Sequence, residues 1–186
     1  MFVTFAAVLL TTVASVLGKN VDSPAIKDST IKHSSEICSD CPENDCNKCM
    51  LGHESTLHAN TGGPTYIQSL IGFHMPVDVS QVIKCTVEIP DFTSKSANAF
   101  TVVISHAAAS DWNEDTVSGE NAPAPGDIIT QIDSAVNYNL DPVDITSACK
   151  AAINGDFSIY FGVQSDSYEF WSKDSGNPAI LHITTE

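Results

Sequence analysis

The sequence contains no arginine, and its basic side chains at neutral pH are eight lysines. Twenty-three carboxylates oppose them, which leaves a formal net charge of −15 over 186 residues. Binding to nucleic acid needs clustered cations against the phosphates, so this composition argues against a nucleic-acid partner. Polyanionic glycans are disfavoured for the same reason. Neutral polysaccharides and divalent cations stay open as ligands.

Long apolar runs are lacking beyond the N-terminus. Residues 1–18 are apolar and end in small residues before Lys19. This run is short for a membrane span and lies at the extreme N-terminus, so it predicts a secretory signal peptide cleaved after Gly18. We therefore expect a secreted, extracellular or wall-associated monomer without a membrane span.

Motifs of hydrolytic enzymes are lacking as well. Ser105 and His106 are neighbours on a predicted strand, so their side chains point to opposite faces. Three carboxylates, Asp111, Glu114 and Asp115, lie within one predicted loop. A glycosidase places its two acids on opposite sides of the sugar, which neighbours on one loop do not do. We predict a non-catalytic protein with no certain cofactor, in which calcium is a candidate ligand of this acidic loop.

Period-two alternation of apolar residues dominates the chain from Tyr66 onward. Apolar residues recur on one predicted face of successive segments: Ile67, Ile71, Phe73 and Met75; Ile83, Cys85, Val87 and Ile89; Phe100, Val102 and Ile104; Phe157, Ile159, Phe161 and Val163; Ala179, Leu181 and Ile183. About eight short strands broken by turn residues predict an all-β fold, an antiparallel sandwich of two sheets. Residues 144–154 alone read as a helix, with Asp144 or Thr146 at its start and Gly155 after its end.

Six cysteines fall into two groups. Cys38, Cys41, Cys46 and Cys49 lie in a polar stretch, residues 19–52, which lacks hydrophobic periodicity and is predicted to be a mostly irregular N-terminal segment. Because these cysteines follow a signal peptide, disulfide bonds are favoured over a zinc site. Two connectivities stay open: a nested one, Cys38 to Cys49 with Cys41 to Cys46, and a paired one, in which each bond joins neighbouring cysteines. A further bond between Cys85 and Cys149 is expected, and it would close a long loop.

Several short motifs occur in a recognisable order: Trp112-Asn113-Glu114, Asn121-Ala122-Pro123, Val143-Asp144-Ile145-Thr146, and Phe170-Trp171-Ser172-Lys173-Asp174 followed by Pro178-Ala179-Ile180-Leu181. Together with strand-like segments upstream, they resemble carbohydrate-binding module family 96, the DNRLRE-type domains, over roughly residues 54–184. The resemblance implies a jelly-roll-like β-sandwich over residues 53–186. It also implies a structural motif made of Trp112, Glu114, Pro123, Thr146, Ser172 and Lys173, in which Glu114 pairs with Lys173.

The resemblance further implies binding to polysaccharide. Alginate is a ligand known in that family, but the lack of arginine argues against it here. Sugar rings stack on exposed aromatic side chains that have amide and carboxylate groups beside them. The candidates are Tyr66, Tyr160, Tyr168 and Trp171, whereas Trp112 is expected to be a buried anchor. The competing hypothesis is a structural or protein-interaction component of the cell wall or secretome without a sugar site.

Overall fold

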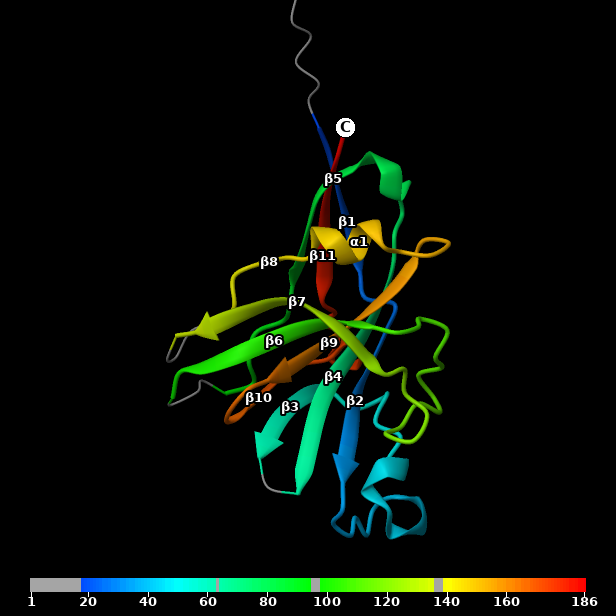
Figure 1. The fold of residues 1–186 in the computed structure, drawn as a ribbon, viewed down its shortest axis with the longest axis vertical. Helices are drawn as coiled ribbons and strands as arrows, with labels where there is room; N and C mark the ends of the chain where they lie inside the picture. The colour runs from blue at the N-terminus through cyan, green and yellow to red at the C-terminus, as the bar shows by residue number, and fades with distance from the viewer. Residues whose placement is uncertain (1–17, 63, 95–97, 136–138) are drawn as a thin grey trace, which may run out of the picture.

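The computed structural model describes residues 18–62, 64–94, 98–135 and 139–186. The predicted signal peptide therefore lies outside the described residues, apart from Gly18. Two antiparallel sheets pack face to face, and the strands of the smaller sheet run along the long axis of the molecule (Figure 1). This arrangement confirms the predicted β-sandwich.

The smaller sheet has four strands in the order β1-β11-β5-β8. Their bounds are Lys19–Pro24 for β1, Ile180–Thr185 for β11, Val82–Glu88 for β5 and Val143–Asp144 for β8. The larger sheet has seven strands in the order β10-β3-β4-β9-β6-β7, and β2 pairs with β4. Their bounds are Ser167–Trp171 for β10, Thr56–Gly62 for β3, Thr65–His74 for β4, Asp156–Val163 for β9, Phe100–Ala107 for β6, Pro125–Ser134 for β7 and Lys27–Ser34 for β2.

The main core fills the space between the two sheets. The larger sheet contributes alternate residues of β9 and β6, and the smaller sheet contributes alternate residues of β5 and β11. Strand β9 shows the pattern that the sequence predicts, because Phe157, Ile159, Phe161 and Val163 are all buried in this core. Burying these side chains is the main favourable contribution to folding.

A second, smaller core lies on the other face of the larger sheet. Leu70 of β4 and Tyr160 of β9 pack there against Trp112 and Val117 of the β6–β7 connection, residues 108–124. The alternation of β4 predicts a polar face here that carries Tyr66, Gln68 and His74. The structure leaves Tyr66 and His74 exposed, as predicted, but buries Gln68. The long connection covers the middle of this face of β4, around Leu70, because it folds back over the sheet.

Strand β5 departs from strict alternation at its start. The sequence places Ile83 in the core, whereas the structure leaves it 52 % exposed and buries Val82. The reason is a register shift, since Thr184 pairs with Lys84 but Thr185 pairs with Val82. Ile83 is therefore the extra residue of a bulge, which turns its side chain outward.

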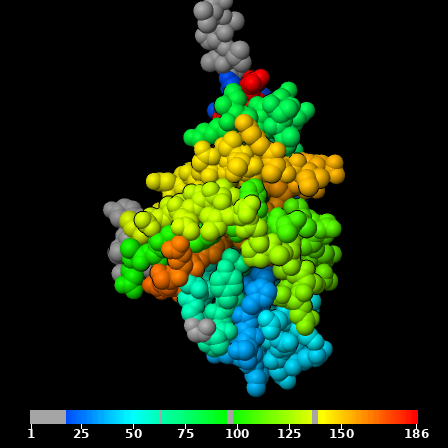
Figure 2. Space-filling view, in the orientation of Figure 1, coloured from blue at the N-terminus to red at the C-terminus, as the bar shows by residue number. Residues whose placement is uncertain are grey.

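Residues 19–52 contain more regular structure than the sequence predicts. Strand β1 pairs with β11 and strand β2 pairs with β4, so this segment begins inside both sheets. Their backbone pairing, and not hydrophobic alternation, defines these strands. Two short 3-10 helices follow, η1 (Pro42–Asn44) and η2 (Cys46–Lys48). The cyan part of Figure 2 shows that the chain after β2 forms a lobe at one end of the molecule.

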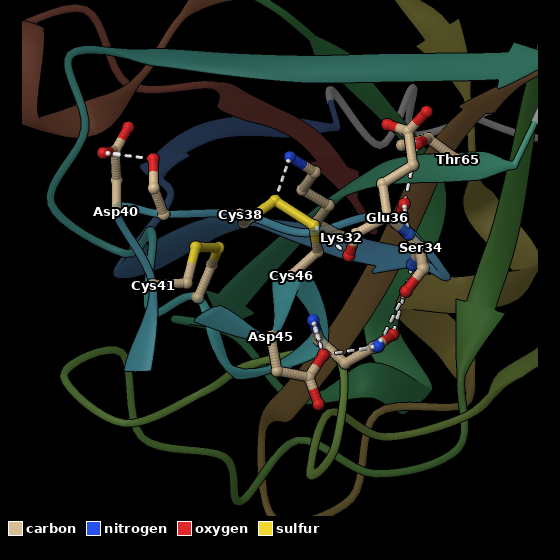
Figure 3. The surroundings of a disulfide bond; sticks show 12 residues. Lys32, Ser34, Glu36, Cys38, Asp40, Cys41, Asp45, Cys46 and Thr65 are labelled. Carbon is tan, nitrogen blue, oxygen red and sulfur yellow. Dashed lines mark hydrogen bonds between the residues drawn. A yellow bond between two sulfur atoms is a disulfide. The ribbon is translucent and has the colours of Figure 1, made fainter. Parts of the chain in front are cut away.

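This lobe is held by two interleaved disulfides, Cys38–Cys46 and Cys41–Cys49 (Figure 3). The expected nested and paired connectivities are both wrong. Each cysteine bonds to one eight residues away, because the turns η1 and η2 bring the two halves of the segment side by side. The Lys32 ammonium donates to the Cys38 sulfur at 3.0 Å and ties the lobe to β2.

The predicted helix over residues 144–154 is one turn, α1 (Thr146–Lys150). Its N-cap is Ile145, without a side-chain capping bond, and its C-cap is Ala151, so the predicted caps Asp144 or Thr146 and the predicted end at Gly155 are wrong. The Asp144 carboxylate still accepts a hydrogen bond from the Thr146 amide at 2.9 Å, one residue before the cap position. The predicted bond between Cys85 and Cys149 is present and joins β5 to α1. Two further 3-10 turns, η3 (Val79–Gln81) and η4 (Lys173–Ser175), lead into β5 and β11.

Candidate functional site

Two of the four predicted sugar-stacking residues are buried. Tyr160 is 1 % exposed, and its hydroxyl donates to the Pro123 carbonyl at 2.6 Å. Tyr168 is 6 % exposed and stacks on Phe100 in the main core. Neither ring can present a face to a sugar, so the structure contradicts both as platform residues. The alternation of β9 predicts a polar face for Tyr160, but the β6–β7 connection covers that face.

The other two candidates, Tyr66 and Trp171, are exposed to 40 % and 39 %. Trp171 ends strand β10 and lines a groove of about 440 Å³. Tyr66 lies on β4 and does not belong to the lining of this groove. The groove is therefore the place where an exposed indole and a concave surface coincide.

Three elements build the groove around Trp171. The end of β5 and its continuation form one side, and the turn between η4 and β11 forms another. Gly176, whose φ of 87° suits glycine, closes η4 and starts that turn. An isolated bridge between Phe92 and Phe170 holds the chain after β5 against β10. The polar groups that line the groove are Glu88, Asp91 and Asn177.

The two acidic residues of the groove are fixed by hydrogen bonds. An Asp91 carboxylate oxygen accepts from the Asn139 amide group at 2.6 Å. A Glu88 carboxylate oxygen lies 2.8 Å from Nε2 of His182, whose Nδ1 lies 2.8 Å from Asp22. The bond with Asp22, with a further contribution from Glu88, raises the pKa of His182 above its usual value. Both ring nitrogens donate only in the imidazolium form, so protonated His182 holds both carboxylates.

The residues of the predicted structural motif anchor loops. Lys173 and Glu114 form the expected ion pair, with Nζ 3.4 Å from Oε2. Glu114 also accepts from the Asp28 amide at 2.6 Å, which ties the β6–β7 connection to β2. The indole nitrogen of Trp112 donates to the Ser158 hydroxyl at 3.0 Å, and the Lys27 ammonium lies over its ring.

The remaining motif residues also make long-range backbone contacts. The buried Ser172 hydroxyl donates to the Glu54 carbonyl at 2.6 Å. The Thr146 hydroxyl accepts from the Cys85 amide at 3.0 Å, and the Pro123 carbonyl is the acceptor of Tyr160 described above. These contacts join segments far apart in sequence, which is a structural role.

The three acids proposed for calcium are not gathered into one site. Glu114 pairs with Lys173, whereas Asp115 lies 2.7 Å from His53 and Asp111 lines a separate hollow beside His106. Ligand atoms of His53, Glu114 and Asp174 do come within 4.8 Å of one another. The Lys173 ammonium contacts both carboxylates of that set, so a resident cation already pairs with each of them. Calcium binding stays a prediction.

Sequence reasoning missed one unusual group beside this motif. Asp28 of β2 is 1 % exposed, and one of its oxygens accepts from the Lys173 amide at 2.7 Å. Burial raises the pKa of its carboxyl to about 6. No sequence signal marks Asp28, because it lies in the segment predicted to be irregular. The groove residues Glu88, Asp91 and Asn177 were missed as well, and so was His182, which contacts Glu88 from outside the groove lining. These residues meet only when β5, β10 and β11 are assembled.

The fold and the groove define a disulfide-stapled antiparallel β-sandwich with an exposed indole beside a surface groove. The chain matches the sequence model of carbohydrate-binding module family 96 over residues 49–185, and it belongs to this family. It is also 51 % identical to an uncharacterized secreted protein of Arthroderma benhamiae over 160 aligned residues. The alignment covers 86 % of this chain and 82 % of that relative.

The secreted relative confirms the predicted extracellular location. Among residues 18–62, 64–94, 98–135 and 139–186, no helix combines the length and apolar character needed to cross a membrane. The family is one of binding modules, in agreement with the predicted class of function.

Proposed function

We propose that this protein is a secreted, non-catalytic module that binds extracellular or cell-wall polysaccharide in the groove around Trp171. The observation that supports this most strongly is the exposed indole at the groove, with an amide and two carboxylates beside it. An apolar sugar face stacks on an aromatic ring while polar neighbours bond to the hydroxyls. Membership of family 96 agrees with this chemistry.

The groove favours a glycan without negative charge. Its two carboxylates and the net charge of −15 would repel uronates and sulfates. Both carboxylates are fixed by neighbours, so they are already oriented as hydrogen-bond acceptors for hydroxyl or amine groups. Fixed acceptors reduce the ordering cost of binding.

The test is a pull-down panel of insoluble polysaccharides, followed by titration with the best ligand, with and without EDTA. Trp171→Ala is expected to weaken binding about tenfold or more, because the stacking surface is lost. Ile128→Ala is the control, since Ile128 is 57 % exposed on β7 at the other end of the larger sheet.

The outcomes separate the site from the function. If Tyr66→Ala abolishes binding and Trp171→Ala does not, polysaccharide binding stands but the groove is the wrong site. If no glycan binds saturably, the proposed function is overturned. Turnover of a glycan by the purified protein would contradict the non-catalytic assignment.

The second candidate is a protein-interaction role, and the disulfide-stapled lobe favours it. Ile37 and Met50 are 84 % and 52 % exposed there, beside a hollow of about 900 Å³ that Pro42 and Leu51 also line. Exposed apolar side chains on a rigid support are typical of protein contacts. This candidate takes precedence if the polysaccharide panel is negative.

A further inference from the structure

The charge of the Trp171 groove has one sign. Among the described residues that line it, the charged ones are Glu88 and Asp91, and the others are neutral. The nearest cation along the chain, Lys173, is held by Glu114 at 3.4 Å and by Asp174 at 3.2 Å. The groove therefore offers negative charge that no lysine within it balances.

Both carboxylates are positioned for a donor from outside the protein. Each has one oxygen engaged, Asp91 with Asn139 and Glu88 with His182. His182 is shared with Asp22, so carboxylates outnumber the imidazolium even when His182 is protonated. The side chain of Glu88 is 53 % exposed, which leaves it accessible to a ligand.

A protonated amine satisfies these groups better than a hydroxyl does. An ammonium donates up to three charge-assisted hydrogen bonds, and such bonds are about twice as strong as neutral ones. An ammonium near an indole face gains a cation–π attraction as well. The net charge of −15 would steer a polycation toward the protein.

From this geometry we infer that the groove takes a cationic amino-sugar polysaccharide, with a sugar face on Trp171 and the ammonium against Glu88 and Asp91. The inference rests on the proposed function and names the ligand class of the same site. It predicts discrimination between a free amine and its N-acetylated form. Acetylation removes the positive charge, so the acetylated ligand offers Glu88 and Asp91 no ion pair of its own.

The experiment compares glucosamine oligomers with N-acetylglucosamine oligomers of equal length, titrated calorimetrically at about pH 5.5, where the amine is protonated. The free amine is expected to bind about tenfold tighter or more, and the preference is expected to shrink as salt is raised. Glu88→Gln with Asp91→Asn should abolish the preference, whereas Trp171→Ala should weaken both ligands.

A matched variant controls for general attraction between an acidic protein and a polycation. Glu120→Gln with Asp127→Asn removes the same two charges from the β6–β7 connection and β7, and it is expected to keep the full preference. If both double variants lose it equally, the attraction is non-specific and the inference is overturned.

Failure of the inference differs from failure of the proposed function. Trp171-dependent binding with no preference for the amine would overturn the amino-sugar assignment and keep the polysaccharide function. If Trp171→Ala leaves the binding of every glycan unchanged, both fail at this groove.

Discussion

At the scale of single residues, the ion pair between Glu114 and Lys173 joins three parts of the chain. Glu114 belongs to the β6–β7 connection, Lys173 begins η4, and the Asp28 amide of β2 donates to the same glutamate. Both side chains are less than a third exposed, at 16 % and 24 %. A partly buried pair with further hydrogen bonds contributes more than a surface pair does.

Lys173→Met tests this contact. The change keeps most of the aliphatic volume but leaves Glu114 and Asp174 without their shared cation. We expect a loss of about 1–2 kcal/mol in the free energy of unfolding, read from urea denaturation. Lys150→Met at the exposed end of α1 is the control and should change little. Equal stability of Lys173→Met and the native protein would show that the pair is not stabilising.

The sequence could predict this ion pair, but it could not predict that Tyr160 and Tyr168 are buried. Trp112, Glu114 and Lys173 occur in a recognisable motif, so their roles follow from the pattern. The burial of Tyr160 depends on Pro123, which reaches it only after the connection folds over the sheet. The Asp91 contact likewise needs Asn139 from a distant loop. Such contacts are long-range, and local alternation carries no information about them.

At the scale of elements, apolar alternation predicts the buried side chains correctly for strands that bury one face in the main core. It fails where another segment covers the opposite face or where the strand's register shifts. Strands β6, β9 and β11 bury the residues that their patterns predict. Strand β5 fails at Ile83 because of its bulge, and β2 is missed because most of its buried side chains are polar. A bulge and a polar buried strand both depend on tertiary pairing, so tertiary context overrides the local pattern.

The bond between Cys85 and Cys149 is an element-scale staple, since it fixes α1 to β5 across 64 residues. Replacing both cysteines with alanine is expected to cost about 4 kcal/mol in the chain-entropy model. Urea denaturation of the oxidised double variant measures the loss. Replacing Cys38 and Cys46, which close a loop of eight residues, should cost less, because a short loop restricts the unfolded chain less.

An alkylation experiment accompanies that variant. The native protein, denatured without reductant, should show no alkylated cysteine by intact mass. A mass shift for two added groups, mapped to Cys85 and Cys149, would remove this bond from the structure. If removing the Cys38–Cys46 bond lowered the free energy of unfolding more than removing the Cys85–Cys149 bond, the entropic explanation would be contradicted.

At the scale of the whole molecule, acidic and histidine side chains set how stability varies with pH. Burial raises the pKa of Asp28 from 3.8 to about 6, and hydrogen bonds, with Asp22 first, raise that of His182 above 6.5. A raised pKa means that the folded state binds the proton more tightly. Each contribution is therefore complete below the unfolded pKa and is lost as pH rises through the folded one.

Other acids act in the opposite direction at lower pH. Backbone hydrogen bonds lower the pKa of Asp45, Asp78 and Asp144 below 3.8. Their contributions are present above pH 3.8 and are lost only as pH falls through the lowered values. The two sets of groups together place the highest stability on the acid side of neutrality.

The free energy of unfolding is accordingly expected to fall as pH rises from about 4 to 8, through two separate windows. Titration of Asp28 is expected to lower the free energy of unfolding by about 3 kcal/mol between pH 3.8 and about 6. Titration of His182 lowers it further above pH 6.5. Urea midpoints across this range measure the slope. Asp28→Asn should flatten the lower window alone, because the amide stays neutral. His182→Gln should lessen the slope of the upper window without removing it, because the hydrogen bond with Asp115 also raises the pKa of His53. A native midpoint that stays constant or rises from pH 5 to 8 would contradict this linkage, since it would mean that neither group holds its proton more tightly in the folded chain.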